Sequence, residues 1–274
     1  YGLALIDLSG RKSRHFLSDR EFNCIYEDPQ GNIWLGGTRG VQMLSPEMNN
    51  IGSFAEGEEV TALLEDRSGE MWVGKGDKKV TCLYEDSAGN VYVGLWTGRG
   101  FDIYDKAAGR HSHAALTGDR SGANWYQDFL EDSRGRFWAA TWEGIGLNEF
   151  DRKSGKFTDF KVDSLSTRLA SCLIEDSRGI LWYGTTENGL DAIDPDTWKV
   201  EHFLKGQYVT CVEEAGDSIL AGTKKGLFSI RARRQRPAGL EVPIASIERD
   251  NSGRIWVSTA EGLFLLTENG PAKV

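Results

Sequence analysis

The stretch from Ile174 to Leu190, IEDSRGILWYGTTENGL, holds the pattern that decides the fold. It begins with the apolar end of a predicted strand, and Asp176 is followed three residues later by Gly179. An Asp side chain accepts backbone N–H bonds in turns, and glycine readily adopts a positive φ, so this segment predicts a tight turn. The apolar run around Trp182 predicts a second strand, and the glycine-containing segment after it predicts another turn. The stretch therefore predicts a strand–turn–strand unit that continues into a third strand.

This pattern recurs along the whole chain. Seven copies align on the Glu-Asp turn and the Trp position, at residues 24–36, 62–74, 82–94, 128–140, 172–184, 211–222 and 246–258. Repeats of roughly 40 residues that each hold four short strands are the sequence signature of propeller blades. We therefore predict an all-β fold, a seven-bladed β-propeller with four-stranded antiparallel blades, in which residues 1–274 form a single domain.

One interval in the series is too short for a complete blade. Successive Trp positions lie 36 to 46 residues apart, except for Trp72 and Tyr92, which are separated by 20. Since no third and fourth strand fit between Gly74 and Thr81, we predict that about half a blade is missing near residues 76–79.

The two ends of the chain also carry partial blades. Residues 2–7 and 13–16 read as a third and a fourth strand, and the last copy ends after a third strand at 262–266. The N-terminal piece is a candidate to complete the last blade and close the ring. The alternative is that the C-terminal tail belongs to a neighbouring propeller.

Composition excludes several classes of function. The net charge of -9 and the pI of about 5.1 argue against a nucleic-acid partner, because an acidic surface repels phosphate backbones. No apolar run approaches the roughly 20 residues of a membrane span. No signal peptide is visible at Tyr1, so we expect the chain to be a fragment of a larger protein.

The repeat resembles that of the two-component regulator propeller family, most closely in residues 174–190. The resemblance implies an extracytoplasmic, periplasmic sensor domain of a hybrid two-component histidine kinase and response regulator, of the kind that recognises oligosaccharides in Bacteroides. It also implies a second propeller and an Ig-like domain in the same chain, and a homodimer of the full-length protein. The kinase lies outside this sequence, so we predict no enzymatic activity, no catalytic residue, no metal and no cofactor.

Two alternatives remain open from the residues themselves. The first alternative is a propeller enzyme that acts on glycans as a lyase or a hydrolase, because streptogramin lyases and sialidases carry related repeats. It has weak support, since none of the four His lies on the predicted binding face beside a carboxylate, and no nucleophile motif occurs. The other alternative is a protein-interaction scaffold.

Regular positions of the repeat are best explained by architecture. The repeated Trp residues are expected to pack between blades, at positions 34, 72, 138, 182 and 256. The four cysteines, Cys24, Cys82, Cys172 and Cys211, occupy one repeat position, where other copies hold Ala62 or Ser246. Equivalent positions of different blades lie too far apart for a disulfide, so we predict small, buried thiols.

Departures from the repeat are the better candidates for function. Asp128 places a carboxylate where other copies hold a small residue, and it follows the aromatic pair Trp125 and Tyr126. Buried charge is costly unless it is paired or used, so this cluster is predicted to line a ligand site.

In a propeller, the loops leading into first strands share a face with the loops between second and third strands. That face is predicted to hold Trp96, Arg99, Trp142 and Glu143, with Arg39 and Arg168 on equivalent or adjacent loops. Aromatic rings stack on sugar rings, and charged groups bond hydroxyls, so the expected ligand is an oligosaccharide.

Overall fold

The computed structural model describes residues 3–7, 12–16, 22–45, 49–76, 80–116, 125–143, 145–159, 164–249, 253–259, 262–267 and 270–273. The chain divides into two compact units, residues 1–115 with residue 274, and residues 116–273. Among the described residues, none belongs to a helix with the length and apolar character that a membrane span requires.

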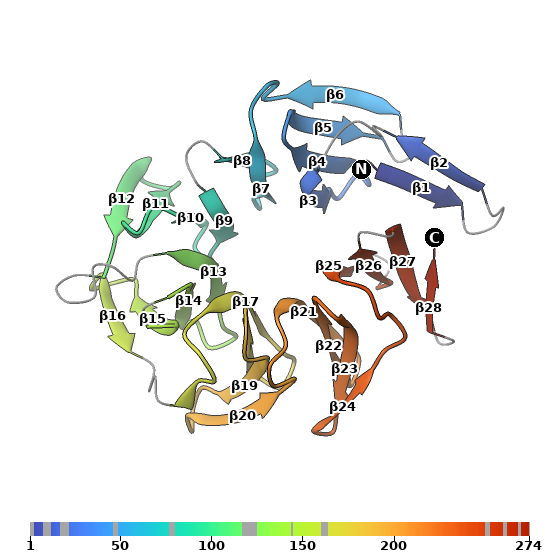
Figure 1. Cartoon of the computed structure of the whole chain (residues 1–274). Coiled ribbons are helices and arrows are strands. Elements are labelled where there is room, and N and C mark those ends of the chain that lie inside the picture. Colours follow the sequence, from blue (N-terminus) through green and yellow to red (C-terminus); the bar gives the residue numbers. More distant parts are fainter. Residues whose placement is uncertain are drawn as a thin grey trace. The chain divides into compact units, whose positions relative to one another are not determined.

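The second unit consists of four consecutive antiparallel sheets, each with four strands in chain order (Figure 1). Their strands are β13 (Tyr126–Glu131), β14 (Phe137–Thr141), β15 (Leu147–Asp151) and β16 (Lys156–Asp159); β17 (Ala170–Glu175), β18 (Leu181–Thr185), β19 (Leu190–Asp194) and β20 (Lys199–Phe203); β21 (Val209–Ala215), β22 (Ser218–Thr223), β23 (Gly226–Arg231) and β24 (Arg234–Pro237); and β25 (Ile244–Arg249), β26 (Ile255–Thr259), β27 (Gly262–Thr267) and β28 (Gly270–Lys273). The first strands β13, β17, β21 and β25 contact one another in succession.

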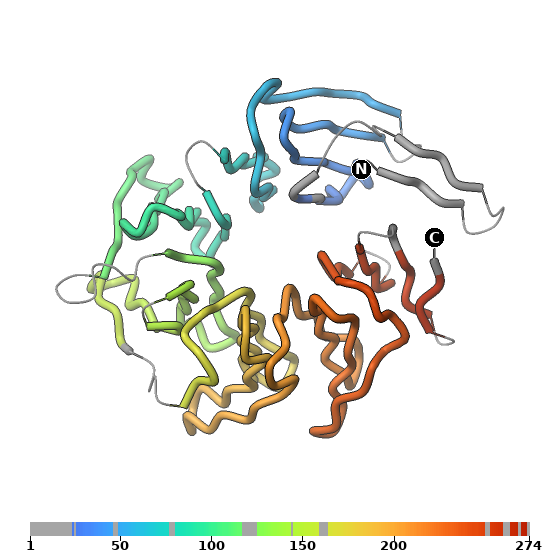
Figure 2. Tube along the Cα trace, viewed as in Figure 1, coloured from blue at the N-terminus to red at the C-terminus, as the bar shows by residue number. Residues whose placement is uncertain are grey.

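The first unit holds two complete sheets and two half-sheets, whose Cα trace is drawn in Figure 2. The complete sheets are β3 (Phe22–Glu27), β4 (Ile33–Gly37), β5 (Gly40–Leu44) and β6 (Asn50–Phe54), and β9 (Val80–Glu85), β10 (Asn90–Leu95), β11 (Phe101–Asp105) and β12 (Arg110–Ala114). The half-sheets are β1 (Leu3–Asp7) with β2 (Lys12–Phe16), and β7 (Val60–Glu65) with β8 (Met71–Lys75).

The fold is an all-β propeller with four-stranded blades, but the predicted number of seven blades is wrong. The structure has six blades of four strands, because the copy at 62–74 forms only the two strands β7 and β8. Four residues separate the end of β8 from the start of β9, which is too short for two strands. This copy is therefore a two-stranded half-blade, and of the segment 76–79, where the other half was predicted to be missing, residues 77–79 lie outside the described residues.

The last blade also differs from the prediction. It is completed by its own fourth strand β28, so the N-terminal hairpin β1–β2 does not supply that strand and forms a separate sheet. Sequence reasoning missed β28 because it is short and contains Pro271. Proline is tolerated here because a fourth strand is an edge strand. That residues 1–274 form a single domain stays a prediction.

The turn Asp accepts an equivalent set of hydrogen bonds in successive blades, so the geometry of the turn repeats from blade to blade. Asp132 accepts the backbone N–H groups of Arg134 and Arg136 at 3.0 and 2.9 Å, and the indole N–H of Trp138 at 2.9 Å. The turn glycine Gly135 has a φ of 77°, which few other residues adopt easily. The same bond from the aromatic side chain to the turn Asp joins Trp34 to Asp28, Trp72 to Asp66, Tyr92 to Asp86 and Trp182 to Asp176. Asp250, the equivalent partner of Trp256, lies outside the described residues.

Neighbouring blades are joined by the Glu of the same turn. Glu175 accepts the backbone N–H and the hydroxyl of Ser133, from the preceding blade, at 2.6 and 2.8 Å. Glu214 holds Ser177 in the same way, at 2.9 and 2.6 Å. In these blades the Glu therefore holds the turn of the preceding blade, whereas the Asp, where one follows the Glu, closes the turn of its own blade.

Close packing of first strands explains the cysteines. A Cβ built on Gly36 would lie 2.6 Å from Cys24 Sγ and 2.6 Å from Val60 of the next blade, so only glycine fits beside the thiol. The four cysteines, all within the described residues, form no disulfide. They are half-buried, and desolvation raises the pKa of the Cys24 thiol to about 11. The prediction of free thiols is confirmed, but the cysteines are half-buried and not fully buried.

Candidate functional site

Four chain segments meet at one end of the second unit. The backbone N–H of Trp142 donates to the carbonyl of Trp125 at 2.8 Å, and Trp142 forms an isolated antiparallel bridge with Leu169. The carbonyl of Leu169 accepts the N–H of Thr186 at 3.0 Å. We call the surface formed by residues 125, 142–143, 164–169 and 186–188 the loop face. It unites loops that lead into first strands with loops between second and third strands, as propeller connectivity requires.

Two indole rings form the centre of the loop face. Trp125 and Trp142 meet edge to face, with ring centroids 6.4 Å apart and an interplanar angle of 73°. Both side chains are half-buried, so part of each ring remains accessible. Edge-to-face pairs of this kind hold both rings in defined orientations. The pair therefore offers a preformed aromatic surface.

Charged residues flank the aromatic pair. Glu143 is exposed and has a φ of 67°, a left-handed conformation that is unfavourable for a residue with a Cβ. Arg168 is exposed on the neighbouring segment. A carboxylate and a guanidinium on the segments that carry or adjoin the two indoles add hydrogen-bond acceptors and donors to the aromatic surface.

The segment that carries Arg168 is held by bonds on both sides of it. Asp191 accepts the N–H of Ser166 at 2.8 Å, and the Asn188 amide donates to the Ser166 carbonyl at 2.9 Å. His202 Nδ1 lies 2.7 Å from the other oxygen of Asp191. The buried Asp191 thus links the fourth strand of its blade to the loop face and positions the segment 164–169.

Sequence reasoning missed this Asp–His pair and a second one like it. Asp102 and His113 occupy the same register in β11 and β12 that Asp191 and His202 occupy in β19 and β20, again with 2.7 Å between carboxylate and Nδ1. The signal was present as Asp and His spaced by eleven residues in two repeats. The bond from Asp102 raises the pKa of His113, with a further contribution from the carbonyl of Arg99. The prediction was that none of the four His lies on the predicted binding face beside a carboxylate; His113 and His202 do lie beside carboxylates, and His113 also contacts the carbonyl of Arg99, a residue of that predicted face.

Asp128 lies between first strands, not on the loop face. Its carboxylate accepts the N–H of Leu173 in the neighbouring first strand at 2.8 Å and the N–H of Phe129 at 2.9 Å. Desolvation raises the pKa of Asp128 to about 7, and the two backbone bonds lower it only in part. Asp128 therefore joins β13 to β17 with a carboxyl that titrates near neutral pH.

Tyr126 is fully buried and does not share a surface with Trp125. Its ring stacks on Phe129 at 5.7 Å and on Phe157 at 6.4 Å. The strand register shifts between Tyr126 and Asp128, which marks a β-bulge at the start of β13. Tyr126 is a core residue and is not part of the loop face.

The other three residues of the predicted site belong to the first unit. Trp96 is 37% exposed at the end of β10, and Arg99 is exposed in the loop that follows it. The carbonyl of Arg99 lies 2.7 Å from His113 Nε2. Arg39 is exposed in the turn between β4 and β5. Within the described part of the chain, no group of three His, Cys, Asp or Glu side chains gathers to hold a metal ion.

Comparison with known proteins identifies the repeat. Residues 17–39 match the family described as the two component regulator propeller. This match confirms the predicted resemblance to that family for this one segment. No curated protein matches the chain.

Solved structures share the fold. The extracellular domain of a hybrid two component system from B. thetaiotaomicron is similar at 16% identity with a TM-score of 0.74, over 93% of this chain and 40% of that one. The computationally designed protein Ika8 is similar at 12% identity with a TM-score of 0.72, over 99% and 90%. Virginiamycin B lyase from Staphylococcus aureus follows at 14% identity with a TM-score of 0.61, over 91% and 83%. The chain thus spans about two fifths of the length of that extracellular domain.

Proposed function

We propose that this chain is a ligand-sensing propeller domain of a hybrid two-component histidine kinase, placed in the periplasm, and that its loop face binds an oligosaccharide. The repeat family and the shared fold with an extracellular sensor domain support the class of protein. The observation that carries the ligand is the Trp125–Trp142 pair, flanked by exposed Glu143 and Arg168.

The chemistry of this surface suits a sugar. The apolar face of a pyranose stacks on an indole, and its hydroxyls bond to charged side chains at the rim. Because Glu143 and Arg168 carry opposite charges, the surface serves both as donor and as acceptor. Arg168 also gives it a cation for an acidic sugar. Trp96, Arg99 and Arg39 of the first unit are proposed as further contacts of the same ligand class.

The proposed mechanism is a shift of population. A ligand changes the output of a sensor only through its differential affinity for two arrangements of the protein. In the full-length protein, the proposed partners in that change are a second propeller, an Ig-like domain and the second subunit of a homodimer. The segment 164–169 is the element of the loop face best suited to report the ligand, because Asp191 connects it to the rest of its blade.

Calorimetric titration of the chain with fractionated oligosaccharide pools tests this function. We expect saturable binding without turnover, and a loss of affinity of about tenfold in Trp142→Ala, since stacking on one ring is worth roughly 1.4 kcal/mol. Trp198→Ala is the control, because this Trp lies in the turn between β19 and β20, at the other end of the blade. Equal affinity of Trp142→Ala and the parent chain would refute the loop face as the site. Turnover of any glycan would instead favour the enzyme.

A further inference from the structure

A groove of about 380 Å³ lies between the blades β17–β20 and β21–β24. It is lined by the turn after β17 and the turn after β23, so it lies at the opposite end of the strands from the loop face. Ile180, Trp182 and Ile230 form part of an apolar floor, and Arg178 and Arg233 stand among the charged residues of the rim. The volume falls within the range of ligand pockets, and charged residues make up half of the lining.

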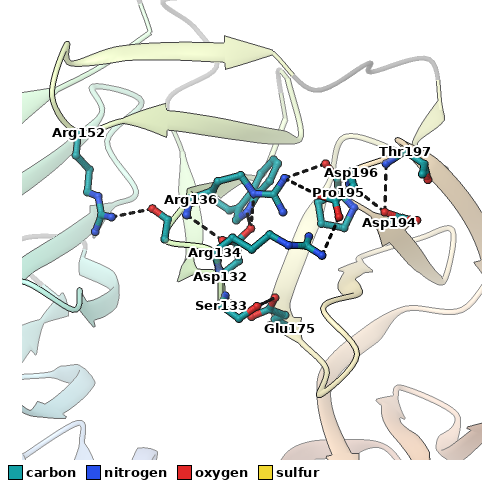
Figure 3. A network of polar contacts seen from close by, with 12 residues as sticks. Asp132, Ser133, Arg134, Arg136, Arg152, Glu175, Asp194, Pro195, Asp196 and Thr197 are labelled. Atoms are coloured by element: carbon teal, nitrogen blue, oxygen red, sulfur yellow. Dashed lines mark hydrogen bonds and ion pairs between the residues drawn. The ribbon is translucent and has the colours of Figure 1, made fainter.

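The equivalent place one blade earlier is covered by the hairpin between β19 and β20, and Figure 3 shows the polar contacts of that hairpin with Arg134 and Arg136. Trp198, from the hairpin between β19 and β20, packs edge to face on Trp138 with 5.9 Å between ring centroids. Asp196 of the same hairpin pairs with Arg134 at 2.7 Å, and Arg136 donates to the Pro195 carbonyl at 3.0 Å. An aromatic side chain and a carboxylate from the following blade therefore cover the buried Trp of the preceding blade.

Hairpin length explains why the second gap stays open. Asp194 pairs with Lys199, which leaves four residues in the turn that covers Trp138. In the next blade Arg231 pairs with Arg234, which leaves only Ala232 and Arg233, with φ values of 46° and 64°. Two left-handed residues are characteristic of the tightest hairpin turn. This shorter turn places Arg233 across the gap, where it pairs with Glu201 of the preceding blade at 2.8 Å, but it has no aromatic residue to place over Trp182.

A four-residue turn in the first unit follows the same rule. Asp105 pairs with Arg110, and Lys106 of that turn reaches back to Asp66 of the preceding half-blade at 2.5 Å. A long hairpin therefore covers the preceding Glu-Asp turn in two independent places. Arg178 is the equivalent of Arg134 in the next repeat. It pairs with Asp176 of its own turn and not with a residue of the following hairpin, and 64% of its side chain is exposed.

We propose that this groove binds an exposed loop of a partner protein that carries an aromatic residue and, two residues before it, a carboxylate. This is the chemistry of Asp196 and Trp198, which fill the equivalent gap. The aromatic ring takes the apolar floor beside Trp182, and the carboxylate pairs with Arg178. The next groove along, of about 400 Å³, has no arginine in its lining and is not expected to accept such a loop.

A cyclic peptide with the sequence of residues 194–199 is the probe. Its binding to the chain, followed by fluorescence anisotropy, is expected to saturate, and a peptide with Ala in the Trp position is expected to bind at least tenfold more weakly. Arg178→Gln is expected to weaken binding about tenfold. Arg236→Gln is the matched control, because Arg236 is exposed in β24 and lies outside the groove lining. Failure of the first peptide to saturate at millimolar concentration would overturn the proposal.

A second variant fills the groove from within. In this variant, the four residues 195–198 replace Ala232 and Arg233, so the turn becomes as long as the equivalent turn of the preceding blade. We expect this variant to lose peptide binding, with an unchanged or higher Tm. If this variant does not fold, Ala192→Phe, which fills the floor from one residue, gives the same test. A folded, filled variant that binds the peptide as well as the parent chain would overturn the proposal. Trp142→Ala should leave peptide binding unchanged, so the result is independent of the proposed sugar site.

Discussion

The two ends of the blades in the second unit use the same residue types in opposite ways. At the end with the Glu-Asp turns, Trp138 is fully buried and bonded to Asp132. On the loop face, Trp125 and Trp142 are half-buried and pack edge to face on each other. The turn end repeats from blade to blade, whereas the loop face does not. Repetition therefore marks residues that hold the blades together, and departures from it mark residues with surface left for a ligand.

Carboxylates show the same contrast. Burial by itself raises the pKa of both Asp132 and Asp128, since desolvation disfavours charge. Asp132 receives four hydrogen bonds, including one from the Arg136 guanidinium, and its pKa ends below the usual value. Asp128 receives two backbone bonds, and its pKa ends at about 7. The direction of each shift is thus the balance between desolvation, which raises the pKa, and the number and charge of the donors, which lower it.

The largest expected effect of this contrast is on stability. Trp138→Ala should lower the free energy of unfolding by about 3–5 kcal/mol, because it opens a cavity and leaves Asp132 without its indole donor. Trp142→Ala should cost roughly 1 kcal/mol, since its ring is already partly solvated. Urea denaturation of both variants measures the difference. Equal losses would show that the loop face is as structural as the turn end.

A somewhat smaller effect is expected for the turn carboxylate. Asp132→Ala should lower the free energy of unfolding by about 3 kcal/mol, because the Trp138 indole and two backbone N–H groups lose their acceptor in a buried site. The control is Asp196→Ala, whose side chain is half exposed and should cost less than about 1 kcal/mol. The prediction fails if denaturant midpoints of the two variants coincide.

The smallest of the three effects depends on pH. A carboxyl whose pKa is higher in the folded than in the unfolded chain stabilises the fold fully below the unfolded value, here about 3.8, and this stabilisation is lost as pH rises through about 7. Stability should therefore fall between pH 4 and pH 7, by on the order of 2 kcal/mol for a half-buried group. Asp128→Ser, with the residue that Ser246 supplies in another blade, should remove this slope. The test is to measure the free energy of unfolding of the parent chain and of Asp128→Ser at pH 5 and at pH 8. If the variant shows the same dependence on pH as the parent chain, another group is responsible for it.

Much of the fold was readable from single repeats. The Glu-Asp-x-x-Gly turn is local chemistry, so turn and strand positions follow from a few adjacent residues, as at Asp176 and Gly179. The half-blade after Trp72 followed from spacing, because strands need a minimum number of residues. The candidate site was only partly readable. Trp125, Trp142, Glu143 and Arg168 were found as departures from the repeat, and the connectivity of a propeller places their loops together.

The sequence by itself determined the propeller class, the four-stranded blade and the residues that repeat, because these depend on periodic, local interactions. Only the tertiary structure decided where Tyr126 points, since a β-bulge breaks the alternation of side chains along β13. It also decided that Asp191 meets His202 and Ser166, across strands and loops that alignment of repeats does not connect. The open groove beside Trp182 depends on a turn two residues shorter in the next blade, and its effect appears only where two blades face each other. Packing between repeats, which no single repeat encodes, is the physical reason in each case.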